Sequence, residues 1–241
     1  MSNDSRLAAA AVLAAGLVIS AVIGGMAVGK LRRAGDQITV TGSATREVRA
    51  DLAVWRLDIT GQEPTQLGAT REAASGASAV RQWLMEQGFA DSAITMRTPF
   101  TMAQNEWVNG METGRILGYR VTQQVELRTT DVDKVATLSG DLTGLLDAGI
   151  PVTGQAPEFL FAALPSIRGP LLADATRDAR SRAEEIVTAA GAQVGRIKSV
   201  QVGVFQVRRR QSVEVSDYGM YDTGDREKDV TGVIRVTFAI E

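Results

Sequence analysis

The chain has 241 residues, a formal net charge of −2 and 22% charged residues, and it contains neither cysteine nor histidine. These two absences exclude disulfides, thiolate nucleophiles, cysteine or histidine metal ligands and hydrolases that need a serine–histidine pair. The weak net charge gives no reason to expect a nucleic-acid partner. We therefore predict no catalytic residues, no cofactor and no metal site.

The N-terminus begins with a short tail, residues 1–6, and continues as an uncharged apolar segment over residues 7–29. A helix of this length reaches roughly 34 Å at ~1.5 Å per residue, enough to cross a ~30 Å hydrocarbon core. The segment predicts a single transmembrane anchor, followed by a basic linker at residues 30–36. A cleaved signal peptide with a small-x-small site at residues 27–29 is the alternative, although its apolar part normally runs about 7 to 15 residues.

The charges that flank the anchor bear on its orientation. Lys30, Arg32 and Arg33 follow the segment, whereas Arg6 precedes it. By the positive-inside rule this count favours a cytoplasmic C-terminal domain. Against this count, we predict an inner-membrane protein whose soluble domain lies in the periplasm.

Small residues recur at four-residue steps within the anchor. Ala21, Gly25 and Gly29 form one such stripe. Stripes of this kind let helix backbones approach closely in lipid, so these three residues are a candidate packing face between anchors. Chance spacing in a segment rich in alanine and glycine is the alternative explanation.

Residues 37–241 predict one α+β domain in which about three helices pack on antiparallel or mixed sheets. A first strand begins at residues 38–41, and period-two alternation predicts a second over residues 50–60. Helical periodicity predicts a helix over residues 66–87, ended by Gly88. The apolar face of that helix consists of Leu67, Ala74, Ala77, Val80 and Leu84.

The middle of the chain predicts two strands separated by a polar loop. The strands cover residues 93–103 and 116–128, and the loop covers residues 104–114 around an Asn-Gly pair. Trp107 falls in this loop, and we expect its ring to anchor the loop to the domain.

The remaining predicted elements are a helix at 130–149, a buried strand at 157–164, a helix at 170–191 and closing strands at 197–207 and 230–240. Thr130 is a good N-cap for the first of these helices, and Pro170 suits the first turn of the second. Gly149 and Gly191 end them. The predicted apolar face of the last helix is Ala175, Ala179, Ala183, Ile186 and Ala190.

Without histidine, acid–base catalysis would need paired carboxylates. Asp51 and Asp58 lie on one predicted strand about 23 Å apart at ~3.3 Å per residue, so they cannot act together. Glu184 and Glu185 lie on a charged helix face, where solvated ion pairs explain them better. The three arginines at 208–210 lack interleaved aromatic residues and predict a solvated strand edge, not a nucleic-acid site.

Four stretches together carry a family resemblance: ITVTGSATREVRADLAVWRLDI at 38–59, GYRVTQQVEL at 118–127, DATRDARSRAEEIVTAAGAQVGRI at 174–197 and VTGVIRVTFAI at 230–240. Their order and spacing resemble the SIMPL-domain family of bacteria. The resemblance implies an exported envelope protein without known catalytic residues. It also implies that some relatives assemble into large rings and that others are linked to oxidative-stress tolerance. Arg49 departs from the proline that many relatives carry before the Ala-Asp pair.

Three functional hypotheses follow. We favour a non-enzymatic, self-assembling cell-envelope protein that is anchored by residues 7–29 and linked by resemblance to envelope or oxidative-stress tolerance. Its partners would be the membrane and further copies of itself in a ring-like homo-oligomer. The second hypothesis is a periplasmic module that binds a small molecule or peptide between sheet and helices, and the third is an enzyme that uses carboxylates.

Overall fold

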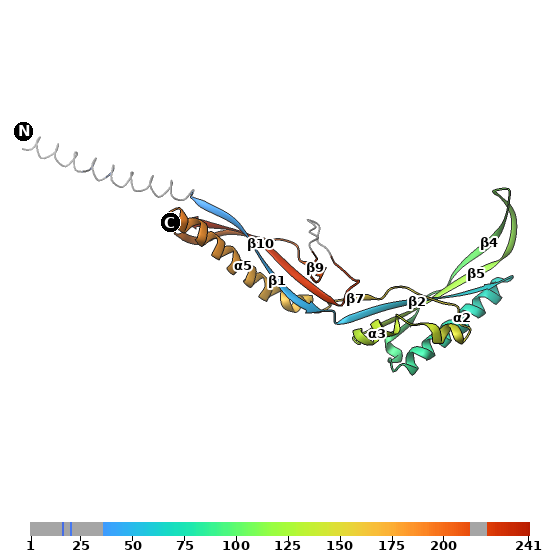
Figure 1. Cartoon of the computed structure of the whole chain (residues 1–241). Coiled ribbons are helices and arrows are strands. Elements are labelled where there is room, and N and C mark those ends of the chain that lie inside the picture. Colours follow the sequence, from blue (N-terminus) through green and yellow to red (C-terminus); the bar gives the residue numbers. More distant parts are fainter. Residues whose placement is uncertain (1–15, 17–19, 21–35, 213–220) are drawn as a thin grey trace, which may run out of the picture. The chain divides into compact units, whose positions relative to one another are not determined.

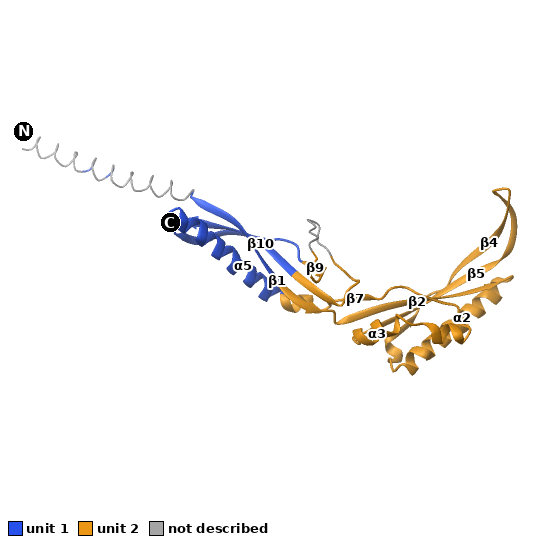
Figure 2. Ribbon diagram, viewed as in Figure 1, with its two compact units in different colours: residues 1–45, 168–205, 231–241 blue, residues 46–167, 206–230 orange. Residues whose placement is uncertain are grey.

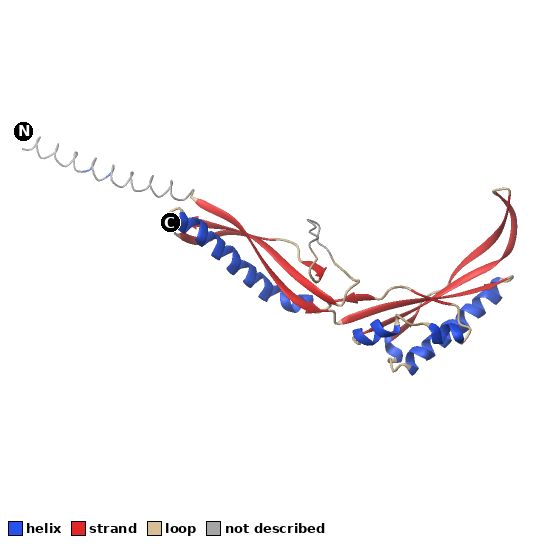
Figure 3. Cartoon of the chain, in the orientation of Figure 1, coloured by secondary structure: helices blue, strands red, loops and turns tan. Residues whose placement is uncertain are grey.

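The computed structural model describes residue 16, residue 20 and residues 36–212 and 221–241. The chain divides into two compact units (Figure 2). Unit 1 consists of Met1–Thr45, Arg168–Phe205 and Thr231–Glu241, and unit 2 consists of Arg46–Ile167 and Gln206–Val230. Each unit has a sheet with helices on one of its faces (Figure 3).

The sheet of unit 1 has the strand order β1-β10-β8 and is covered by one long helix (Figure 1). Its elements are β1 (Gln37–Arg49), α5 (Leu164–Ala189), β8 (Val194–Val202) and β10 (Glu227–Ile240). Strands β8 and β10 are antiparallel, with Val200 opposite Val236. The residues of α5 that are buried are Leu171, Ala175, Ala179, Ala183 and Val187.

The sheet of unit 2 has the order β3-β5-β2-β6, with β4 also paired to β5 and β7 also paired to β2. Its strands are β2 (Leu52–Glu63), β3 (Ile94–Met96), β4 (Phe100–Val108), β5 (Met111–Thr129), β6 (Val152–Gly154) and β7 (Glu158–Leu160). The short β9 (Gln206–Arg209) pairs with β10. The helices of unit 2 are α2 (Gln66–Glu86), the 3₁₀ turn η1 (Asp91–Ala93), α3 (Val132–Leu138) and α4 (Thr143–Asp147).

Helix α2 begins and ends where its sequence predicts. The Thr65 side chain accepts a hydrogen bond from the backbone N–H of Gly68 at 3.1 Å, which satisfies one free donor of the first turn. Gly88, with φ +86°, follows its C-terminus in the left-handed region that favours glycine. Between these ends the helix packs on a core that includes the fully buried Trp55 and Leu57 of β2.

In both units a strand glycine lies directly against an alanine-lined helix. A Cβ atom built on Gly42 of β1 would lie 2.2 Å from the carbonyl oxygen of Ala175 in α5. A Cβ atom on Gly61 of β2 would lie 2.3 Å from the carbonyl oxygen of Ala69 in α2. Only glycine allows this approach of helix to sheet. The close approach therefore fixes which strands each helix covers.

The predicted α+β class with antiparallel sheets is confirmed, but the described residues form four α-helices where about three were predicted. The prediction of one helix at 130–149 is wrong, because the helix is interrupted between α3 and α4. At the break, the Asp141 carboxylate accepts a hydrogen bond from the backbone N–H of Thr143 at 2.9 Å. Such a side chain-to-backbone bond favours a turn over a continuous helix. The N-cap of α3 is Asp131, not Thr130.

Two predicted helix faces also need correction. Leu67 was placed on the buried face of the first helix, yet it is 60% exposed, and Ala69 and Ala73 are buried instead. Ile186 was placed on the buried face of the last helix, yet it is 55% exposed, and Val187 is buried instead. In both helices the buried alanines follow four-residue steps, at 69, 73 and 77 in α2 and at 175, 179 and 183 in α5. Only a small side chain fits where the helix lies so close to the sheet.

Several element boundaries differ from the prediction. The buried strand predicted at 157–164 shrinks to the three residues of β7, because helix α5 already begins at Leu164. Pro170 consequently lies inside the helix and not in its first turn. The strand predicted at 197–207 is divided into β8 and β9.

No helix among the described residues is long and apolar enough to cross a membrane. The anchor predicted at residues 7–29 lies outside the described residues except for Gly16 and Ser20.

Candidate functional site

Strands β4 and β5 extend beyond the rest of the unit 2 sheet as a two-stranded hairpin (Figure 1). Strand β5 pairs with β2 only as far as Tyr119, which lies opposite Glu63, and before that point β5 pairs with β4 alone. A two-residue loop joins the strands, with Asn109 at φ 52° and Gly110 at φ 80°. These positive angles belong to the type I′ turn, for which Asn-Gly is a preferred sequence. The two-stranded part begins at Gln104, because residues 100–103 pair with residues 119–122 of β5, where β5 also pairs with β2. We call residues 100–117 the hairpin arm, which includes these four residues at its base.

The hairpin arm replaces the polar loop predicted at residues 104–114. Trp107 was expected to anchor that loop, but it is 64% exposed. The sequence prediction missed the hairpin because its strands lack clean alternation. Register shifts interrupt the pairing of β4 with β5 on both sides of Asn105. The Asn-Gly pair was the signal that could have revealed it.

The hairpin arm exposes an unusual amount of apolar surface. Seven of its large hydrophobic side chains are between 49 and 71% exposed: Phe100, Met102, Trp107, Val108, Met111, Ile116 and Leu117. At roughly 150–200 Å² for each large side chain, they expose on the order of 600 Å² over the two faces of the arm. Exposed apolar patches of this size mark sites of interaction.

Polar cross-strand contacts hold the tip of the arm together. Glu106 accepts a hydrogen bond from the Thr113 hydroxyl at 2.8 Å and forms an ion pair with Arg115 at 3.4 Å. The Asn105 side-chain amide donates to the carboxylate of Glu112. An isolated two-stranded hairpin is only marginally stable in water. A third strand or a covering surface would therefore stabilise the arm.

The face of the unit 2 sheet opposite α2 is polar and internally bonded. Cross-strand pairs between β2 and β5 form a ladder along this face: Arg56–Glu126, Asp58–Gln124, Thr60–Thr122 and Gln62–Arg120. Each pair also carries a side-chain hydrogen bond, of 3.2, 2.8, 3.5 and 3.3 Å respectively. The ladder stabilises strand pairing, and its donors and acceptors largely satisfy one another.

Glu126 lies at the centre of the charged end of this ladder. Arg97 donates to both of its carboxylate oxygens at 2.9 and 2.8 Å, and Arg56 donates at 3.2 Å while also binding Glu158 at 2.7 Å. The hydrogen bonds from Arg97 lower the pKa of Glu126 below its ordinary value, although burial opposes the shift. A carboxylate held ionised by two guanidinium groups is a poor proton donor near neutral pH.

The two aspartates weighed as acid–base candidates are both engaged in holding the backbone or the sheet. The carboxylate of Asp51 accepts backbone N–H bonds from Ala162 at 2.6 Å and Ala163 at 2.9 Å, just before α5 begins. Asp58 accepts from the side-chain amides of Gln124 and Gln155 at 2.8 and 2.7 Å. Within the family-like stretch at 38–59, Asp51 thus holds the backbone that leads into α5.

Strand β8 forms an exposed edge of the unit 1 sheet. Val200 and Val202 lie opposite the buried Val236 and Ile234 of β10, so they share the face that α5 covers. They are nevertheless 48 and 56% exposed, because α5 lies close against β1, at Gly42, and leaves the β8 edge open.

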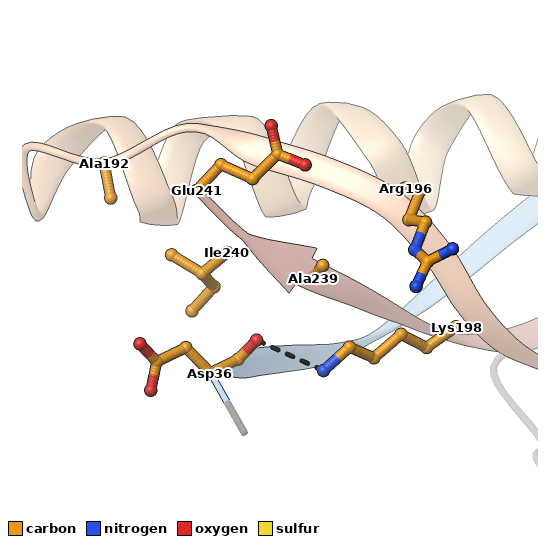
Figure 4. A pocket seen from close by; sticks show the side chains of 7 residues that line it. All are labelled: Asp36, Ala192, Arg196, Lys198, Ala239, Ile240 and Glu241. Carbon is orange, nitrogen blue, oxygen red and sulfur yellow. Dashed lines mark hydrogen bonds between the residues drawn. The ribbon is translucent and has the colours of Figure 1, made fainter. Parts of the chain in front are cut away.

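A pocket of about 770 Å³ lies at the end of this sheet (Figure 4). Its lining includes Arg196 and Lys198 of β8, and Lys198 donates to the backbone oxygen of Asp36 at 3.4 Å. The lining also includes Asp36 and Glu241. In Figure 4 the Asp36 carboxylate lies on the side away from the two cationic ends, whereas the Glu241 carboxylate points toward the side of Arg196. Among the described residues, no three aspartate or glutamate side chains gather as a metal-binding group. The predicted anchor-packing residues Ala21, Gly25 and Gly29 lie outside the described residues.

Comparison with protein-family models gives a match over most of the chain. The family model SIMPL, described as a protein of unknown function (DUF541), matches residues 38–238. No curated protein matches the chain.

Proposed function

The chain belongs to the SIMPL family, and from this premise we propose that it is a membrane-anchored, self-assembling protein of the cell envelope that performs no catalysis. The observation that carries the proposal is the exposed apolar surface of the hairpin arm. Burying about half of it contributes on the order of 7 kcal/mol at roughly 25 cal/mol per Å², before the cost of association.

The anchor adds a second source of association. Residues 7–29 hold copies of the chain in one membrane plane, where they are concentrated and oriented, so modest contacts suffice to join them. The stripe of Ala21, Gly25 and Gly29 favours close packing of neighbouring anchors. Replacing Gly25 and Gly29 with leucine therefore loosens the assembly without touching the hairpin arm.

Co-purification tests the proposal directly. Two differently tagged full-length copies are expressed together, extracted in mild detergent and captured through one tag. We expect the second copy to be retained, and retention to fall when Met102, Trp107 and Met111 are replaced with serine. A matched control replaces three exposed apolar residues outside the arm, Leu67, Met85 and Leu146, and should retain the partner.

If both triple variants retain the second copy equally well, the copies associate through another surface. No retention by the wild-type chain in several mild detergents would refute self-assembly. Circular dichroism of each variant separates loss of binding from loss of folding.

The periplasmic orientation is a separate part of the proposal. It is supported by the family premise and opposed by Lys30, Arg32 and Arg33. An alkaline phosphatase fusion after Glu241 should be active, because the phosphatase folds only outside the cytoplasm. An inactive fusion, together with an active cytoplasmic reporter at the same position, would reverse the orientation.

The pocket at the end of the unit 1 sheet favours a second candidate function, the binding of a small anion. Arg196 and Lys198 present two cationic groups to a cavity of about 770 Å³. Calorimetric titration of the full-length chain with inorganic phosphate tests it. Saturable heat that disappears when both cations are replaced with alanine would support binding, and an absence of heat would reject it.

A further inference from the structure

We propose that the hairpin arm of one copy binds the exposed edge strand β8 of a second copy, so that β4 and β8 pair across the interface. The inference rests on the proposed self-association and names the two surfaces that perform it. Both surfaces are open within the described part of the chain. Strand β4 pairs there only with β5, and strand β8 only with β10.

The two edges match in length and in hydrogen-bonding capacity. Strand β4 covers the nine residues Phe100–Val108, and β8 covers the nine residues Val194–Val202. Alternate backbone N–H and C=O groups of an edge strand point away from its partner, and another strand satisfies them by joining the sheet. Such pairing would also give the two-stranded arm the third strand that a stable sheet needs.

The apolar side chains of the two surfaces complement this backbone pairing. Strand β8 exposes Ile197, Val200 and Val202 to between 45 and 56%, on the face where α5 leaves the sheet edge uncovered. The hairpin arm brings Met102 and Trp107, which are 55 and 64% exposed. Joining the edges removes apolar surface of both strands from water at the same time.

Charge favours this pairing over a symmetric one. Strand β8 carries Arg196 and Lys198 and no acidic residue, whereas the hairpin arm carries Glu106 and Glu112 against a single Arg115. Pairing β8 with a second β8 would set cations against cations, which destabilises cross-strand contacts. Pairing β8 with the arm sets unlike charges together.

A contact between two different surfaces has a consequence for the size of the assembly. Each copy that offers its arm still has a free β8, so the contact repeats from copy to copy. Such head-to-tail contacts close into rings or continue as filaments, whereas a symmetric contact stops at a dimer. The pairing therefore accounts for an assembly of more than two copies.

Cysteine cross-linking in the membrane tests the pairing, because the chain has no cysteine of its own. Two conservative single variants place a thiol near the middle of each strand: Ala103→Cys on β4 and Ser199→Cys on β8, both at exposed positions. The two full-length variants carry different tags, are expressed together, and are treated with a short bismaleimide. A matched control pairs Ser199→Cys with Ser75→Cys on the exposed side of α2.

We expect cross-linked dimers that contain both tags, at least fivefold above either single variant alone and above the control. The double variant Ala103→Cys/Ser199→Cys should give a ladder of covalent multimers. Dimers formed mainly within one single variant would overturn the pairing in favour of a symmetric contact. If the two tagged copies co-purify but this cross-link does not form, the pairing of β4 with β8 is wrong and self-assembly stands. If the chain is strictly monomeric, self-assembly is wrong as well. If the thiol of Ala103→Cys instead reacts with a cross-linker carried by lipid and forms no dimer, the arm binds the bilayer and not a second copy.

Discussion

The close approach of α2 to β2 at Gly61 allows the loss of stability in a Gly61 variant to be predicted from the structure. In the variant Gly61→Ala, the added Cβ lies 2.3 Å from the carbonyl oxygen of Ala69 and 2.7 Å from the backbone nitrogen of Ala73. Both neighbours are backbone atoms of α2, so no side-chain rotation relieves the contact, and the helix must move by about 1 Å to restore normal separations. That movement opens the core beneath α2, where Ala77 and Val80 are fully buried.

Overpacking of a core typically costs about 1–3 kcal/mol, and contact with rigid backbone places this variant near the upper end. A loss of about 3 kcal/mol lowers the melting temperature by roughly 6–12 °C for a chain of this size. The control is Gly144→Ala in α4, since its Cβ meets no atom within 4 Å. Alanine there should leave the melting temperature unchanged or raise it slightly, because alanine favours helix over glycine.

Thermal unfolding of the full-length chain in detergent, followed by near-ultraviolet circular dichroism, measures both variants. Trp55 is fully buried beneath α2 and reports on this packing. A melting temperature of Gly61→Ala within about 1 °C of Gly144→Ala would refute the argument that backbone contact alone demands glycine at this position.

Three further predictions concern single hydrogen-bonded groups. The pKa of Glu126 is lowered on folding, so its ionised form stabilises the fold above the ordinary value of about 4.3, and this contribution is lost as the pH falls through the folded pKa. Glu126→Gln should thus be less stable than wild type at pH 7 and lose less stability on acidification, measured by urea unfolding; an unchanged acid limb would contradict this. Asp51→Ala leaves the N–H groups of Ala162 and Ala163 without their acceptor and should cost about 2 kcal/mol in the same assay, with Asp51→Asn intermediate. Thr65→Ala removes the N-cap of α2 and should cost about 1 kcal/mol, and an unchanged urea midpoint would show that the cap is dispensable.

Elements with strong local signals were predicted well from the sequence. Helix α2 was expected over residues 66–87 and covers Gln66–Glu86, because its apolar period and the terminating Gly88 agree. The long β5 strand was expected over residues 116–128 and covers Met111–Thr129, so its start differs by five residues and its end by one. Where period, cap and terminator point to the same boundary, sequence suffices.

Tertiary contacts decided the elements that were predicted poorly. The buried face of α5 is set by its contact with Gly42 on the distant strand β1, and that of α2 by its contact with Gly61 on the preceding strand β2. The period of each helix alone does not reveal these contacts. The break between α3 and α4 depends on the bonding of Asp141. The hairpin arm was missed because an exposed apolar hairpin has no buried face to impose alternation on its sequence.

The candidate site was accordingly the least predictable part of the molecule. Sequence reasoning placed self-association on the anchor stripe and named no strand for it. The structure adds two open surfaces, the β8 edge and the hairpin arm, with Trp107 exposed near the tip of the arm. A tryptophan close to an Asn-Gly pair, as at Trp107 here, is the sequence signal that can reveal such an arm.

The mass of the detergent-extracted full-length chain tests self-assembly most directly. Single-particle mass measurement at micromolar concentration should give a discrete species that is an integer multiple, greater than two, of the 25.7 kDa chain plus bound detergent. The triple serine variant at Met102, Trp107 and Met111 should shift most of the mass toward the single chain. A wild-type chain that is strictly monomeric in several mild detergents would contradict the central claim.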